Sequence, residues 1–272
     1  MDKFTDFLDS KLSDGQRCFT SKEAISAVGS SPRAFASLIG RQRKKRRVAR
    51  AQRGFYLILR PEDWAMGAPD PAGWIAPLMR YQGVDYRVSL LRAAAFHGAS
   101  RQAAMVFQVV APKQFRDITI GRQHIQFLYQ EPAAFAKVNR PEWLGQIRSY
   151  TGFANVAGPE LTLFDSVRYF HKAGGLNGVA QMVRDIGAKT TPKKLTGMAP
   201  FFENSCLRRL GYLFELCGYA RQAAALEPFA ARAKSAALLN PSVRPTVMKT
   251  PNRCETSNRW SLILNEAVEI EE

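Results

Sequence analysis

The chain has 272 residues, and 46% of them are hydrophobic, which is enough to build a packed core. Its 39 lysines and arginines against 23 acidic residues give a formal net charge of +16, which predicts a polyanionic partner. No apolar run is long enough to span a membrane, and the charged start MDKFTDFLDSKLSDG lacks the pattern of a signal peptide. We therefore expect a cytoplasmic globular protein with no membrane contact.

The cysteines and histidines are too scattered to indicate a disulfide framework or a metal site. No C-x-x-C pair occurs, and the histidines stand at no spacing typical of zinc ligands. We expect reduced thiols, no metal and no cofactor. The cysteines are Cys18, Cys206, Cys217 and Cys254, and the histidines are His97, His124 and His171.

The first sixty residues predict three helices. Apolar residues recur at helical spacing over residues 2–12. Thr20 and Glu23 have the T-x-x-E spacing of a capping box, so a second helix is expected to begin there. The sequence G-S-S-P at 29–32 then predicts a tight turn into a third helix over about residues 32–45.

The third helix is expected to bury one face and expose the other, and a hairpin should follow it. The inward face holds Phe35, Leu38, Ile39 and Gln42, and the outward face holds Arg33, Ser37, Arg41 and Lys44. Residues 46–50 and 55–59 are predicted strands, joined by 51–54, where Gly54 can supply a positive φ. This order of elements is typical of a winged helix-turn-helix.

Positive charge is concentrated in the same region. Residues 1–60 hold 14 basic and 5 acidic residues, and eight basic residues with no acid lie between Arg41 and Arg53. Such a run can be a solvated face, a localisation tag or a patch for anionic lipid. Its position on a groove-sized helix and a wing favours double-stranded DNA, whose phosphates it would neutralise.

The candidate DNA-binding residues divide by role. Arg33, Ser37 and Arg41 are expected to read bases, because arginine can bind guanine through two hydrogen bonds. The two serines before the helix and the residues from Lys44 to Arg53 are expected to hold phosphates and the minor groove. The full set is Ser30, Ser31, Arg33, Ser37, Arg41, Arg43, Lys44, Lys45, Arg46, Arg47, Arg50 and Arg53.

Beyond this region the sequence predicts a linker and a second domain. We place the winged domain at 1–62, a proline-rich linker packed through Trp64 and Trp74 at 63–80, and an α+β domain at 81–272. That domain should hold a small, mainly antiparallel sheet and several helices. Its predicted strands are 105–112, 115–120 and 124–130, with a hairpin at Gly121-Arg122; helices follow from Glu160, and a last strand is expected over 260–265.

No motif in the second domain points to catalysis. The sequence lacks the nucleotide-binding, nucleophile-elbow and zinc-protease patterns G-x-x-x-x-G-K-[ST], G-x-G-x-x-G, G-x-S-x-G and H-E-x-x-H. Glu160 and Asp165 stand at i and i+5, where side chains of a helix diverge. We therefore expect no catalytic residues. Arg208 and Arg209, with Lys193 and Lys194, are interpreted as a solvated face, or else as a second basic surface.

Nearly the whole chain resembles the AbiEi family, antitoxins of bacterial type IV toxin–antitoxin (abortive infection) systems. The segments that carry the resemblance are Arg53-Gly54-Phe55-Tyr56, Tyr86-Arg87-Val88-Ser89, Ala95-Phe96-His97-Gly98, Glu160-Leu161-Thr162-Leu163-Phe164-Asp165, Gly174-Gly175-Leu176 and Arg209-Leu210-Gly211-Tyr212-Leu213. The resemblance implies an autorepressor that binds inverted repeats at its own promoter. It also implies a C-terminal domain that opposes a nucleotidyltransferase toxin encoded beside it.

The resemblance has limits. The run from Arg43 to Arg47 is denser than the family's usual L-x-R-x-G entry to the wing. The chain is not the toxin itself, because Gly29-Ser30 is not followed by the D-x-D carboxylates that bind metal in nucleotidyltransferases. The alternative hypothesis is a protein-interaction module, or an uncharacterised enzyme, with an incidental basic N-terminal arm.

Overall fold

The computed structural model describes residues 3–99, 106–149, 152–243 and 255–270 and has a mixed α+β fold. The chain divides into two compact units. The first takes the described residues of 1–88, 105–132 and 145–156, and the second takes those of 89–104, 133–144 and 157–272. The expected domain boundaries at 62 and 80 stay predictions.

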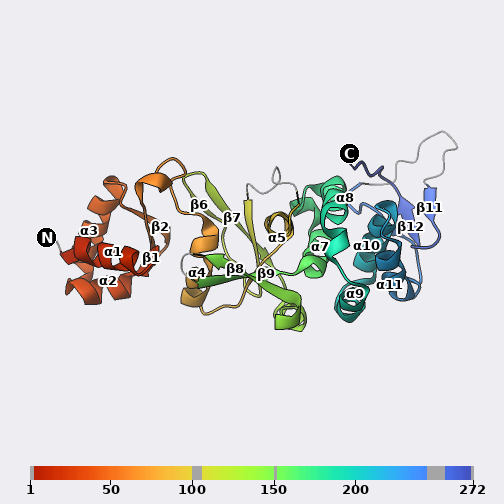
Figure 1. Cartoon of the computed structure of the whole chain (residues 1–272), viewed down its shortest axis with the longest axis horizontal. Helices are drawn as coiled ribbons and strands as arrows, with labels where there is room; N and C mark the ends of the chain where they lie inside the picture. Colours follow the sequence, from red (N-terminus) through yellow and green to blue (C-terminus); the bar gives the residue numbers. More distant parts are fainter. Residues whose placement is uncertain (1–2, 100–105, 150–151, 244–254, 271–272) are drawn as a thin grey trace. The chain divides into compact units, whose positions relative to one another are not determined.

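The first unit begins with three helices and a three-stranded antiparallel sheet (Figure 1). These elements are α1 (Lys3–Ser13), β1 (Cys18–Thr20), α2 (Ser21–Val28), α3 (Pro32–Lys44), β2 (Val48–Gln52) and β3 (Phe55–Ile58). The sheet order is β1-β3-β2. The three predicted helices are confirmed, and so is the hairpin, but its first strand is Val48–Gln52 instead of 46–50, because Arg46 and Arg47 belong to the turn that ends α3. Strand β1 was not predicted, because three residues are too few to display a strand period.

The turn between α2 and α3 follows the predicted capping chemistry. Thr20 and Glu23 make both hydrogen bonds of a capping box at the start of α2. Gly29 ends that helix in the left-handed conformation, with φ 66°. Ser31 caps α3 by accepting a hydrogen bond from the backbone N–H of Ala34, and Pro32 occupies the first turn. Local sequence therefore fixes where α3 begins.

Aromatic rings from the helices and the sheet pack into one cluster. Phe4 of α1 lies 6.4 Å from Phe35 of α3, measured between ring centroids, and 6.0 Å from Phe19 of β1. Tyr56 of β3 stacks on Phe19 and meets Phe35 edge-on. Phe35, Ile39 and Gln42 are at least 93% buried, as predicted, and Leu38 is partly buried.

The segment after β3 is folded and held against both sides of this module. It contains two short 3-10 helices, Pro61–Asp63 and Pro71–Gly73, and then α4 (Ile75–Gln82). Asp63 forms a buried ion pair with Arg17, the residue directly before β1 in the sequence. Trp74 is fully buried, as the expected packing of this segment requires, whereas Trp64 is 49% exposed.

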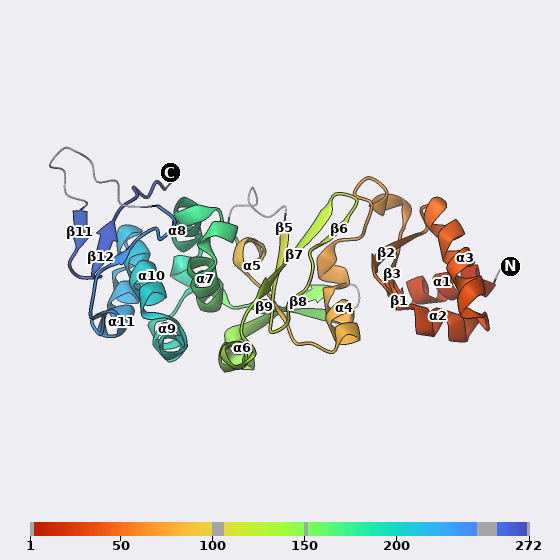
Figure 2. The same cartoon turned by 180° about the vertical axis from the view of Figure 1, so that it is seen from behind.

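The rest of the first unit is a six-stranded sheet in the order β6-β7-β5-β4-β9-β8 (Figure 2). Its strands are β4 (Arg87–Val88), β5 (Val106–Ala111), β6 (Ile118–Ile120), β7 (Gln123–Tyr129), β8 (Leu144–Ser149) and β9 (Gly152–Ala157). Position 105 of the predicted strand lies outside the described residues. Position 112 lies beyond the end of β5.

The expectation of a small, mainly antiparallel sheet is met only in part, because the six-stranded sheet is mixed. Strand β4 pairs antiparallel with β5, as β6 does with β7, but other pairs are parallel. The predicted hairpin exists, since β6 pairs antiparallel with β7 across Gly121. However, β7 rather than β6 lies beside β5, so these two strands run parallel, and β4 also runs parallel to β9. The sequence predicted the strands of the hairpin but not which of them joins β5, because that choice depends on non-local packing.

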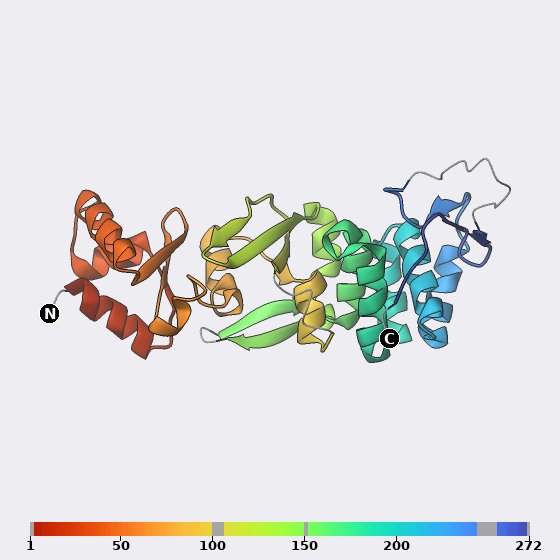
Figure 3. The same cartoon turned by 90° about the horizontal axis from the view of Figure 1, so that it is seen from above.

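The second unit is mainly helical (Figure 3). Its helices are α5 (Leu90–Phe96), α6 (Pro132–Val138), α7 (Pro159–Arg168), α8 (Gly175–Ile186), α9 (Pro192–Met198), α10 (Asn204–Leu216) and α11 (Ala220–Ala230). A small sheet follows, with strands β10 (Ala237–Leu238), β11 (Glu255–Ser257) and β12 (Leu262–Leu264). Strand β12 confirms the last predicted strand in a shorter form, because Ser261 adopts a positive φ of 47° and interrupts it.

Helix α7 lies in the core of this unit and is buried from Glu160 to Val167. Its polar groups are paired: Glu160 accepts hydrogen bonds from the backbone and hydroxyl of Thr191, and Asp165 accepts one from Ser89. Glu160 and Asp165 do not meet each other in any hydrogen bond of the described residues. Because they are hydrogen-bonded to Thr191 and Ser89, the two carboxylates help to hold α7 in place.

Helix α10 carries two arginines that we expected on a solvated face, and this expectation is wrong for Arg208. Its side chain is buried, with only 6% of the residue exposed, and Arg209 is partly buried. Both guanidinium groups turn towards backbone carbonyls of the chain that follows α11. Lys193 and Lys194 of α9 are exposed, as expected.

Glycine at position 211 is required by the packing of α10. A Cβ atom there would overlap the ring of Trp260, which is fully buried. Gly40, in the exposed part of α3, has no atom within 4 Å of the place where its Cβ would lie. The two helical glycines therefore have opposite environments.

We predict that Gly211→Ala lowers the free energy of unfolding by about 1–3 kcal/mol, because the steric cost exceeds the better helix propensity of alanine. The matched substitution Gly40→Ala should raise it by about 0.5–1 kcal/mol. Urea denaturation followed by circular dichroism measures both. Equal losses in the two variants would contradict the packing described for α10.

Candidate nucleic-acid interface

The outward face of α3 is flat and cationic. Arg33, Ser37, Arg41 and Lys44 are all exposed, as the helical period predicts. Between them lie the small residues Ala36 and Gly40, which are also exposed. Small side chains flanked by arginines allow the backbone of a helix to approach a groove closely while the arginines reach to either side.

The end of α3 forms a Schellman motif, which turns the chain from the helix into the wing. The backbone N–H of Arg46 donates to the carbonyl of Arg43, and that of Arg47 donates to the carbonyl of Gln42. Arg46 occupies the left-handed position of this motif, with φ 53°. Glycine is the usual residue at this position, because the left-handed conformation is unfavourable for a residue with a Cβ atom such as arginine.

We predict that Arg46→Gly raises the free energy of unfolding by up to about 1 kcal/mol, because it relieves this backbone conformation. The control Arg46→Ala removes the same charge but keeps the Cβ atom, so it should give no such gain. Chemical denaturation of the two variants side by side is the measurement. Equal stability of the glycine and alanine variants would contradict the assigned strain.

The wing is a hairpin braced by α4. Gly54 has a φ of 81° in the turn, as predicted, and the exposed Arg53 precedes it. The hydroxyl of Tyr81 donates a hydrogen bond to the carbonyl of Arg53, at 3.3 Å, and the side chains of Gln82 and Gln52 are joined at 2.8 Å. The position of the wing is therefore fixed from outside the winged module.

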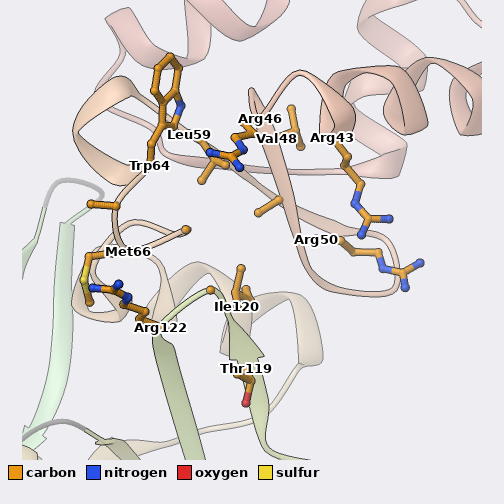
Figure 4. Close-up of a pocket in the computed structure, with 14 residues that line it drawn as sticks. Arg43, Arg46, Val48, Arg50, Leu59, Trp64, Met66, Thr119, Ile120 and Arg122 are labelled. Carbon is orange, nitrogen blue, oxygen red and sulfur yellow. The ribbon is translucent and has the colours of Figure 1, made fainter.

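A basic cleft of about 620 Å³ lies between the wing and the tip of the β6–β7 hairpin (Figure 4). Arg43, Arg46 and Arg50 line one side, and Arg122 lines the other. The half-exposed Trp64 also lines it. None of its lining residues is acidic.

A close backbone contact holds the far side of this cleft in place. Gly121, at the hairpin tip, lies so near Gly67 that a Cβ atom on it would come within 2.7 Å of the Cα of Gly67. The N–H of Arg122 donates to the carbonyl of Met66 at 2.8 Å. Arg122 and Trp64 are not among the DNA-binding candidates predicted from the sequence. Nothing in the sequence signals them, because the contact joins segments more than fifty residues apart.

Two candidates from the sequence turn inward. The hydroxyl of Ser30 is covered and makes no hydrogen bond within the described residues. Arg47 is partly buried against α1, where it donates to the hydroxyl of Thr5 at 3.2 Å and lies 3.9 Å from the carboxylate of Asp9. The other ten candidates have exposed side chains. The structure therefore gathers ten of the twelve on the surface of α3, its C-terminus and the wing.

The described thiols and His97 offer little reactivity. Burial raises the pKa of Cys18 to about 11, of Cys206 to about 12 and of Cys217 to about 11, so these thiols stay protonated at neutral pH. Burial also lowers the pKa of His97, whose Nε2 lies 2.7 Å from the carbonyl of Ala157. Cys254 lies outside the described residues.

The residues that the structure describes contain neither a metal-binding cluster nor a membrane-spanning helix. Among these residues, no group of three or more histidine, cysteine, aspartate or glutamate side chains could hold a metal ion. None of the helices described is both long and apolar enough to cross a membrane.

Comparison with known families bears on the middle part of the chain. Residues 87–216 match the family model described as the AbiEi antitoxin C-terminal domain. This segment is similar to the antitoxin domain of the AbiEi family. The resemblance noted from the sequence is thereby confirmed for these residues. No curated protein matches the chain.

The structure explains several of the motifs that identify the AbiEi domain. Gly174 and Gly175 both have positive φ angles, 81° and 73°, where the chain enters α8. Gly211 makes room for Trp260, and Arg209 donates to the carbonyls of Leu238 and Leu239. The residues that carry the resemblance in α7, α8 and α10 are thus mainly structural.

The whole fold is similar to that of the Rv2827c protein from Mycobacterium tuberculosis, known from a crystal structure. The TM-score is 0.63, and the match covers 95% of this chain and 89% of that chain. Because the two sequences are 13% identical, this similarity bears on the fold alone.

Proposed function

We propose that residues 3–60 are a winged helix-turn-helix that binds duplex DNA, with α3 in the major groove and the β2–β3 hairpin over the flanking phosphates. The observation that carries this proposal is the exposed cationic face of α3, whose opposite face is held in the aromatic cluster. From Ala24 to Pro61 the sequence contains no acidic residue, so nothing along this stretch repels a phosphate.

The exposed residues divide into two functional groups in this proposal. Arg33, Ser37 and Arg41 read bases, because they project from the middle of the helix face. Lys44, Lys45, Arg50 and Arg53 hold phosphates beside the groove. The arginines of the basic cleft, including Arg122, extend the phosphate track beyond the wing. Ser30 and Arg47 are not assigned to this surface, because the hydroxyl of Ser30 is covered and Arg47 donates a hydrogen bond to Thr5.

We further propose that the protein is the antitoxin and autorepressor of a type IV toxin–antitoxin system, acting in the cytoplasm by binding rather than by catalysis. The AbiEi antitoxin C-terminal domain at 87–216 supports this role. Its partner would be a nucleotidyltransferase toxin from the same operon. Its DNA target would be inverted repeats at the operon promoter, which two copies of the chain would occupy.

We predict that Arg41→Ala weakens binding to the chain's own promoter by roughly 5–150-fold relative to a scrambled duplex, as expected for loss of a base-reading contact. Lys45→Ala should instead weaken binding to both duplexes and flatten the salt slope by about one unit. Gel shifts at several salt concentrations measure both effects.

The matched control is Lys193→Ala, which removes one exposed charge from α9, in the second unit. It should bind both duplexes as the unmodified chain does. If Arg41→Ala and Lys45→Ala also bound promoter DNA normally, the DNA-binding surface would be assigned wrongly. The hypothesis of an incidental basic arm would then be preferred.

The antitoxin role predicts rescue that does not depend on DNA binding. Expressed from an unrelated promoter, the full chain should restore growth of cells that produce the nucleotidyltransferase encoded next to it. The variants Arg41→Ala and Lys45→Ala should restore growth equally well, because the AbiEi domain is unchanged in them. Continued growth arrest at matched levels of unmodified protein would refute this role.

A further inference from the structure

A second basic pocket lies in the helical second unit, which contains none of the residues assigned to DNA. It has a volume of about 440 Å³ and is formed by the turn before α10, the first turns of α10, the end of α11 and residues 232–235. Its polar lining includes Arg208, Arg232 and Lys234, and no acidic residue lines it. Its apolar lining includes Phe202 and Phe229.

Arg208 is the unusual residue of this pocket, which we name the Arg208 pocket. The residue is 94% buried, yet among the described residues its side chain has no carboxylate partner. Within the described part of the chain, only its Nη1 is bonded, to the carbonyls of Ser235 and Ser261, at 2.8 and 2.9 Å. A buried cation without a counter-charge is costly, and the same burial lowers the pKa of its guanidinium group.

The other edge of the Arg208 guanidinium group, formed by Nε and Nη2, is suited to bind an oxyanion. Nε and Nη2 of Arg208 donate no hydrogen bond within the described residues. In Arg168 of the same unit, these two nitrogens bind the carboxylate oxygens of Glu203, at 2.8 to 3.1 Å. Nε and Nη2 of Arg208 can therefore bind two oxygen atoms of a single ligand group, once a small movement of the side chain exposes Nε.

The charges around Arg208 indicate which kind of oxyanion the pocket would bind. Arg232 is held over the ring of Phe229, with its guanidinium carbon 5.1 Å from the ring centroid, and Lys234 is exposed at the rim. Three cations with no acid suit a group that carries more than one negative charge and several oxygen atoms, as phosphate does, better than a single carboxylate. Because Arg208 is almost fully buried, a ligand must enter the pocket to reach it. A small molecule can do so more readily than a DNA duplex.

We propose that the Arg208 pocket binds the phosphate group of a small molecule, with Arg208 as the inner ligand and Arg232 and Lys234 at the rim. The site is independent of the DNA-binding surface. The shared chemistry is the phosphate group, and its source is either a free inorganic phosphate or a nucleotide. The partly exposed ring of Phe229 at the pocket would favour a nucleotide base.

Calorimetric titration of the full chain at fixed ionic strength tests the proposal. The probes are inorganic phosphate, pyrophosphate and the four common ribonucleoside triphosphates. The double variant Arg232→Gln with Lys234→Gln, both at exposed positions, should weaken binding at least about tenfold. Arg208→Met should abolish binding, but it also removes the hydrogen bonds to two carbonyls, so the double variant is the decisive one.

The matched control is Arg221→Gln with Lys193→Gln, which removes the same charge from exposed positions that do not line the pocket. It should change the affinity less than about twofold. Tighter binding of triphosphates than of pyrophosphate would identify a nucleotide as the source. Equal affinity would identify the phosphate group alone, and either result supports the proposal.

Three results would overturn it. One is the absence of saturable binding by every phosphate probe, and another is equal weakening in the double variant and its control. The third is displacement of the bound phosphate by duplex DNA or by an acidic peptide, with the same dependence on Arg232 and Lys234. That result would assign the pocket to a macromolecular partner.

Discussion

The aromatic cluster of the first unit is the constraint on which the candidate interface depends. Phe35 can join Phe4 and Tyr56 only if α3 turns one face towards α1 and the sheet. The helical period then leaves the opposite face, with Arg33 and Arg41, to the solvent. Burial of apolar rings therefore determines where positive charge is displayed, although the charged residues themselves add little to the stability of the module.

The wing depends on contacts that lie outside the winged module. Asp63 pairs with the buried Arg17, and α4 reaches the hairpin through Tyr81. On the other side of the cleft, Gly121 brings the β6–β7 hairpin against the chain near Gly67. These contacts make the cationic surface a property of the whole first unit. A winged module cut out of the chain would lose the supports that position its wing.

The AbiEi domain uses its characteristic residues chiefly for packing. Its polar motif residues, such as Glu160 and Asp165, are buried and hydrogen-bonded, and Gly211 admits a tryptophan ring. Recognition of a partner must then be carried by residues outside these motifs. The Arg208 pocket meets this condition in part, because five of its eleven lining residues, Phe229 and residues 232–235, follow residue 216, where the family match ends.

The sequence by itself determined the local structure of the first sixty residues: the capping box at Thr20, the helix stop at Gly29 and the two faces of α3. These features depend on hydrogen bonds and periodicity within a few residues, so a sequence pattern can predict them. Only the tertiary structure decided that β5 pairs with β7, that Arg122 lines the basic cleft, and that Arg208 is buried. Each of these depends on contacts between distant segments, and a local pattern carries no information about them.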